Sequence, residues 1–199
     1  SIREYICNFI MSKLETNTID NISGSSTLTI GDSNTSTITL KSGATLTNFP
    51  DNTPSFMVLL SSGVSVNSGS NTVIAFDTEI YDTDNAVSSG VFTVPSGEAG
   101  KYFFAVNAGM NTGNNIDYVN IWLSKNNQTT IASTNGEAIG IEFHHEGTKS
   151  SNQIQSVSGI MNLAVGDTVR VYILHNFGSA KNTATGGRCT FSGYKLIGV

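Results

Sequence analysis

The run at residues 142–146, Glu-Phe-His-His-Glu, is the part of this sequence that most resembles a metal site. Side chains alternate between the two faces of an extended strand, so Glu142, His144 and Glu146 would lie on one face. Carboxylate and imidazole groups in that arrangement can hold a cation. A polar loop or an exposed strand explains the same residues without a ligand, and we favour this second interpretation.

Other residues that could do chemistry stand in weaker contexts. The run at 82–85, Asp-Thr-Asp-Asn, offers oxygen ligands, but its spacing is not that of an EF-hand and favours a solvated turn. His175 stands alone near the end of an apolar run, which favours a structural role. Cys7 and Cys189 lie at opposite ends of the chain without C-x-x-C partners, so we favour two free thiols over a disulfide or a zinc site.

The motifs of common catalytic sites are missing from the sequence. It contains no nucleophile elbow, no H-E-x-x-H pattern and no phosphate-binding glycine loop. We therefore expect a protein that is not an enzyme, with no catalytic residues, no bound metal and no cofactor.

The composition indicates a β protein. Among the 199 residues, only 13% are charged, whereas there are 25 Ser, 23 Thr, 21 Asn and 20 Gly. Such residues disfavour helices and favour short strands joined by tight turns. The net charge of −5 argues against a general nucleic-acid binder, and no apolar run is long enough for a transmembrane helix. The first ten residues lack the apolar region of a signal peptide, so we expect none.

Composition divides the chain into parts with different patterns. Ser, Thr and Asn fill 20 of the 39 positions from 12 to 50, whereas 55–199 alternates apolar runs with turns. We expect residues 12–50 to be a β shaft or anchor, 51–54 a linker and 55–199 a folded knob. Residues 1–11 are expected to be an upstream extension, because Met-Ser-Lys at 11–13 has the form of a natural start.

The expected shaft consists of short strands in which Thr alternates with aliphatic residues. The alternation places these aliphatic side chains on one face of each strand: Leu28, Ile30, Ile38, Leu40 and Leu46. One thin apolar face is marginal alone in water. The segment is therefore either disordered, as many polar tracts are, or stable because copies from several chains face a shared axis. Only the second alternative accounts for the alternation, and we favour it.

Apolar runs of strand length recur throughout the expected knob, with no strong helical period. We expect nine strands, or ten, at 56–60, 73–80, 91–94, 102–108, 118–123, 130–133, 155–163, 168–174 and 189–197. This spacing predicts an all-β sandwich or jelly roll.

Four runs in the expected knob, in this order, resemble the signatures of the globular head of complement C1q. They read VFTVP at 91–95, GKYFF at 100–104, LAVGDTVRV at 163–171 and TFSGY at 190–194. Trp-Leu-Ser-Lys-Asn at 122–126 is similar to the strand and K-N-G turn of that family, with Asn127 in place of the Gly. The resemblance implies a ten-stranded jelly roll, shared with tumour necrosis factor, that packs as a trimer. Some members of the similar family bind calcium near their loops.

The strand around residues 100–106 has two apolar faces. Tyr102 and Phe104 share one face, and Phe103 and Ala105 share the other. One face can cover the sandwich core, and the other then requires a partner subunit, unless loops cover it in a monomer. We expect the trimer interface of the knob to lie around Tyr102, Phe104 and Tyr194.

Residues 27–34 and 37–48 are similar to segments that build threaded β shafts in the trimeric fibres of tailed phages. The leading hypothesis is therefore a homotrimeric virion fibre or decoration protein. Its N-terminal segment would contact other virion proteins, and its knob would bind a host surface glycan or protein. The alternative is a secreted lectin-like or cytokine-like recognition protein of a cellular organism. A glycan hydrolase on a fibre is a third, weaker hypothesis.

Overall fold

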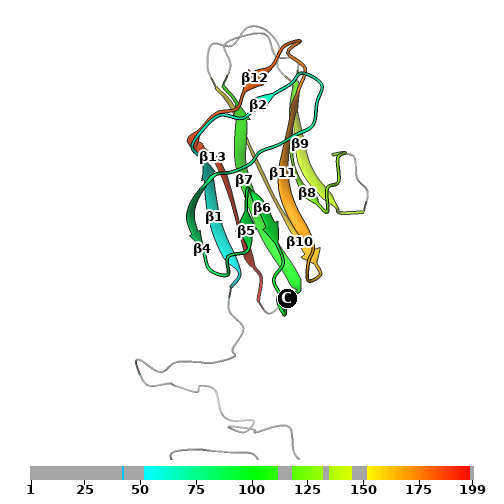
Figure 1. Cartoon of the computed structure of the whole chain (residues 1–199). Coiled ribbons are helices and arrows are strands. Elements are labelled where there is room, and N and C mark those ends of the chain that lie inside the picture. Colours follow the sequence, from blue (N-terminus) through cyan, green and yellow to red (C-terminus); the bar gives the residue numbers. More distant parts are fainter. Residues whose placement is uncertain (1–41, 43–51, 112–117, 132–134, 145–151, 198–199) are drawn as a thin grey trace, which may run out of the picture. The chain divides into compact units, whose positions relative to one another are not determined.

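The computed structural model describes residues 42, 52–111, 118–131, 135–144 and 152–197. The chain divides into two units, residues 1–47 and 48–199, and the fold below belongs to the second. Its described part contains thirteen strands and no helix (Figure 1). The expected shaft, with Leu28, Ile30, Ile38, Leu40 and Leu46, lies outside the described residues.

Five strands form the first antiparallel sheet. Their order across the sheet is β10 (Gln153–Leu163), β7 (Gly100–Met110), β13 (Gly186–Lys195), β1 (Ser55–Leu60) and β4 (Thr78–Asp82). The first and last strands of the domain, β1 and β13, are therefore neighbours in the middle of this sheet (Figure 1).

The second antiparallel sheet packs against the first. Its strands follow the order β5 (Val87–Ser88), β6 (Val91–Thr93), β11 (Thr168–His175), β8 (Tyr118–Lys125) and β9 (Ala138–His144), and β3 (Thr72–Val73) also pairs with β11. A small third sheet joins β2 (Ser65–Val66) to β12 (Lys181–Asn182). The chain crosses between the two large sheets several times, whereas β5 and β6, and likewise β8 and β9, are neighbours within the second sheet. The result is a sandwich that confirms the all-β prediction.

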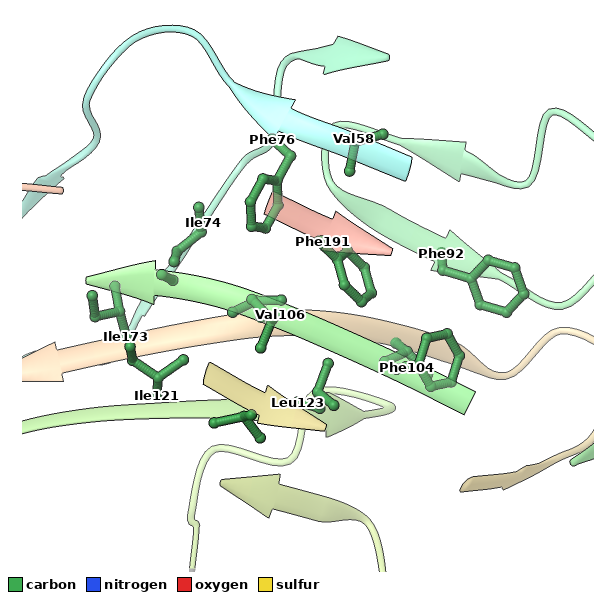
Figure 2. Packing of buried hydrophobic residues seen from close by; sticks show 14 of the residues in the cluster. Val58, Ile74, Phe76, Phe92, Phe104, Val106, Ile121, Leu123, Ile173 and Phe191 are labelled. Atoms are coloured by element: carbon green, nitrogen blue, oxygen red, sulfur yellow. The ribbon is translucent and has the colours of Figure 1, made fainter. Parts of the chain in front are cut away.

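The core between the sheets is rich in aromatic side chains that interdigitate (Figure 2). Phe56 stacks on Phe92 with ring centroids 5.3 Å apart and meets the edge of Phe191 at 4.9 Å. Phe104 contacts Phe92 at 5.5 Å. Edge-to-face and offset contacts of this kind add to the hydrophobic stabilisation of buried rings.

This packing explains two of the residue types in the Phe-Ser-Gly-Tyr run of β13, residues 191–194. Phe191 points into the core and is fully buried, and Gly193, two residues later, faces the same way. A Cβ atom on Gly193 would lie 2.5 Å from Cδ1 of Phe104 and 3.0 Å from Cε1 of Phe56. Glycine is therefore required here by space, because two phenylalanine rings occupy the position of a side chain.

Two sequence expectations about strands were wrong. The run at 73–80 is not one strand: β3 pairs with β11 in the second sheet, whereas β4 pairs with β1 in the first. The chain crosses between the sheets at 74–77, where Ile74 and Phe76 fill the core. Thr130 and Ile131 are not in a strand, and the rest of that expected strand lies outside the described residues. Conversely, β9 is not among the nine expected strands, although an exposed strand is one of the two alternatives given for residues 142–146.

Candidate assembly surface

The outward-facing side of the first sheet carries a group of exposed and partly exposed apolar residues. Along β7, burial alternates, so that Tyr102, Phe104 and Val106 are buried while Phe103 and Ala105 are only partly buried. Strand pairing extends this outward set across neighbouring strands, because directly paired residues share a face.

Phe103 is the centre of the group. It pairs with Ile160 of β10 on one side and with Tyr194 of β13 on the other, and the rings of Phe103 and Tyr194 are 5.5 Å apart. Ile160 is 57% exposed and Tyr194 is 39% exposed. Two strands further along the sheet, Met57 of β1 pairs with Tyr81 of β4, which is 46% exposed. We call these five residues the assembly face: Met57, Tyr81, Phe103, Ile160 and Tyr194.

Polar side chains border the assembly face within the same sheet. The hydroxyl of Ser156 donates a hydrogen bond to Oδ1 of Asn107, and Nδ2 of Asn107 donates to Oγ1 of Thr190 at 3.3 Å. The side chains of these three residues are thus hydrogen-bonded to one another across β10, β7 and β13. The sheet therefore presents an apolar area with a polar border, which is the usual organisation of a protein interface.

The structure places two of the three expected interface residues of the knob elsewhere. Tyr102 and Phe104 have no exposed surface, because they face the second sheet and pack on Phe92 at 5.2 and 5.5 Å. They have no surface left for a second subunit, so their assignment to an interface was wrong. The hydroxyl of Tyr102 donates to the carbonyl of Glu98, and burial raises the pKa of this phenol to about 12.

Tyr194, the third expected residue, does lie on the outward side of the sheet. The expectation omitted Phe103 and Ile160, although the alternation in β7 contained the signal for Phe103. Sequence alternation shows that two faces exist, but both faces of β7 are apolar, and only the position of the second sheet decides which one is outside.

The residues with metal-like spacing form an exposed pair on β9. Glu142 and His144 share one face, as expected, and Oε1 of Glu142 lies 2.7 Å from Nε2 of His144. Nδ2 of Asn120 donates to the other carboxylate oxygen at 2.9 Å, and these hydrogen bonds lower the pKa of Glu142. Glu146 lies outside the described residues, and within them no group of three or more metal-ligating residues forms.

The run at 82–85 builds a turn. Oδ2 of Asp82 accepts a hydrogen bond from the backbone N–H of Val87 at 2.7 Å, and Oδ2 of Asp84 accepts one from the hydroxyl of Thr83 at 2.6 Å. Asn85 takes a left-handed backbone conformation with φ of 51°. The carboxylates are thus used to hold the turn that leads into β5.

The remaining candidates are buried structural groups. His175 has no exposed surface and contacts the carbonyl of Val66 through Nε2 at 2.9 Å. Cys189 is a buried free thiol, and burial raises its pKa to about 12, so it is not nucleophilic near neutral pH. Cys7 lies outside the described residues.

The strand order and the antiparallel pairing define a two-sheet β sandwich of the jelly-roll class. The C1q domain family matches residues 55–196, and this chain belongs to that family. No curated protein matched the chain. Among the described residues, no helix is long and apolar enough to cross a membrane.

Solved structures are similar to this chain at low sequence identity. The globular domain of zebrafish complement 1qA is 19% identical, with a TM-score of 0.51 over 72% of this chain and 98% of that one. Eiger TNF from S. frugiperda is 13% identical, with a TM-score of 0.47 over 73% and 95%. Murine APRIL is 13% identical, with a TM-score of 0.48 over 71% and 98%.

Proposed function

We propose that this chain is a non-enzymatic recognition protein that assembles as a homotrimer through the assembly face of its C1q domain. The observation that carries the proposal is the contact of Phe103 with Tyr194, beside Ile160, on an exposed sheet face. Full burial of a large apolar side chain contributes about 1.5–3 kcal/mol. These residues are partly exposed in one chain, and threefold symmetry would repeat each contact in every subunit.

The test is the solution mass of the full chain by light scattering. We expect a trimer for the natural chain, and dissociation for Ile160→Asp, which places a charge beside Phe103 on the assembly face. Val165→Asp is the matched control, because Val165 is 52% exposed but lies in the turn between β10 and β11. A monomeric natural chain would refute the trimer, and an undisturbed Ile160→Asp trimer would move the interface to another surface.

We further propose that the trimer is a tailed-phage fibre or decoration protein. Residues 12–50 would form its shaft and contact other virion proteins, and the knob would attach to a host surface glycan or protein. The Thr-aliphatic alternation of 12–50 supports this proposal. Three weak knob sites on one fibre would gain avidity on a multivalent surface.

The alternative is a secreted recognition protein of a cellular organism, and the C1q family membership is equally compatible with it. Immunogold electron microscopy with antibodies against the knob separates the two. Labelling of phage particles from the source culture supports the virion protein, whereas antigen confined to the particle-free medium supports the secreted one. Incubation with host glycans should show binding without release of fragments, and steady release would indicate a hydrolase.

A further inference from the structure

A groove of about 380 Å³ opens at one edge of the sandwich, between β4, the edge strand of the first sheet, and β5, the edge strand of the second. Its lining combines residues from β1, the crossing segment, β4, β5 and the turn after β5: Val58, Ala75, Phe76, Asp77, Thr78, Glu79, Val87, Ser89 and Gly90. This volume lies in the usual range of about 300–1,000 Å³ for ligand pockets in proteins.

The floor of the groove is apolar and buried. Val58 and Phe76, both labelled in Figure 2, are almost completely buried. Ser89 and Gly90 form a two-residue hairpin turn with φ of 49° and 74°. A Cβ atom on Gly90 would lie 2.6 Å from the backbone nitrogen of Phe76, so the turn packs directly on the crossing segment. Backbone contact between the turn and the crossing segment thus closes one side of the groove.

The rim of the groove is acidic. Asp77 accepts hydrogen bonds from the backbone N–H of Ser61 at 2.7 Å and from its hydroxyl at 2.8 Å, and these bonds lower its pKa. Glu79 faces the groove because it pairs with the inward-facing Val58, and its carboxylate has no hydrogen bond or ion pair with another described residue. The described lining contains no Lys, Arg or His. A side chain with an apolar stem and a cationic end complements the apolar floor and acidic rim of this groove.

An unpaired strand edge lies beside the groove. Within the described residues, β4 pairs only with β1, so its other edge presents backbone groups that can pair with an additional strand. The register shift between Met57 and Val58 leaves Ile80 as an extra residue in β4, and Ile80 is 55% exposed. Strand addition to a free edge is a common mode of peptide recognition, in which pockets for alternate side chains provide specificity.

We propose that β4 binds an extended segment of a partner polypeptide as an added strand, with a lysine or arginine side chain of that segment in the groove against Glu79 and Asp77. The apolar floor contacts the methylene stem, and the acidic rim pairs with the cationic end. The added strand would also cover Ile80. This site uses the free edge of β4 and the groove behind it, whereas the assembly face uses the outward side of the same sheet, to which β4 contributes Tyr81.

The test is an NMR titration of the ¹⁵N-labelled full chain with the blocked peptide Thr-Val-Thr-Lys-Thr-Val-Thr. The control peptide has norleucine in place of lysine, which keeps the stem and removes the charge. We expect the lysine peptide to shift the amides of 79–82 and 87–90 and to bind about fivefold more tightly than the norleucine peptide, as for a partly exposed ion pair. A lysine peptide with N-methylated valines should bind more weakly, because it cannot complete the strand ladder.

Two protein variants locate the interaction. Glu79→Lys should abolish binding of the lysine peptide and leave the solution mass unchanged. Asp84→Asn is the control, because it removes an exposed charge in the nearby turn, and it should bind as the natural chain does. The proposal is overturned by equal affinity for the two peptides, by retained binding in Glu79→Lys, or by no shift up to about 10 mM peptide, which would detect millimolar complexes.

Discussion

The side chains of Asn126 and Asp167 join the end of β8 to the turn before β11. Nδ2 of Asn126 donates to Oδ1 of Asp167 at 2.8 Å, while Oδ1 of Asn126 accepts from the backbone N–H of Thr168 at 2.9 Å. Asp167 also accepts from Lys125 at 2.9 Å and from the backbone N–H of Ala164 at 2.9 Å. Two runs that resemble family signatures, about forty residues apart, thus form one hydrogen-bonded junction.

Asp167→Asn should destabilise the knob by about 2 kcal/mol, because charge-assisted hydrogen bonds would be replaced by weaker ones. The hydrogen bonds from Asn126 and Lys125 lower the pKa of Asp167 from 3.8 to about 2. A depressed pKa stabilises the fold above pH 3.8, and this contribution is lost as the pH falls toward 2. Urea unfolding at pH 7 and pH 3 should show a smaller pH dependence in the variant; an equal dependence in both proteins would contradict the prediction.

Gly193→Ala should destabilise the knob by about 1–3 kcal/mol, because the added methyl group overlaps the rings of Phe104 and Phe56. Gly187→Ala is the matched control in the same strand, since a Cβ atom there meets no atom within 4 Å. Thermal unfolding followed by circular dichroism would measure both variants. Similar midpoints for the two would show that the core accommodates the methyl group.

The knob should lose stability between pH 7 and pH 5 through His175. Nε2 of His175 contacts the carbonyl of Val66, and Nδ1 accepts the backbone N–H of Phe177 at 3.1 Å, so the neutral ring satisfies both nitrogens. Burial, with a smaller contribution from Lys181, lowers the pKa of His175 below 6.5. The unfolded chain therefore binds the proton more readily, and stability falls as the pH drops below 6.5.

The check is urea unfolding of the natural chain and of His175→Gln at pH 7.5 and pH 5.5. The variant should be less stable at pH 7.5 but should show a smaller difference between the two pH values. His144→Gln is the control, because that imidazole is exposed, and it should retain the natural pH dependence. The same pH dependence in all three proteins would assign it to other groups.

Tyr102→Phe should lower the free energy of unfolding by about 1 kcal/mol, because it removes the hydrogen bond to the carbonyl of Glu98 from a buried site. The solution mass should not change, since Tyr102 is inside the protomer. Tyr102→Asp should instead prevent folding, because it buries an unpaired charge. A folded Tyr102→Asp monomer would return Tyr102 to a subunit interface.

Local pattern predicted most of the strands in the knob. The expected strands at 102–108 and 168–174 correspond to β7 and β11, because a period of two is a property of the strand itself. The sequence pattern failed at 73–80. There β3 ends in the second sheet and β4 begins in the first, but the residues between them are also mostly apolar, so the sequence reads as one strand. It also missed β9, whose exposed face carries Glu142 and His144 and reads as a polar loop.

The sequence by itself determined the β class of the domain, the places of most of its long strands and the runs of residues that resemble the C1q family. These features depend on side-chain alternation and turn residues, which are local. The tertiary structure alone decided that Phe103 faces outward while Tyr102 and Phe104 are buried, and that Glu79 and Asp77 meet at one groove. The first depends on which side of β7 the second sheet covers, and the second depends on which strands lie at the same edge of the sandwich. Both are long-range contacts, which a local sequence period does not encode.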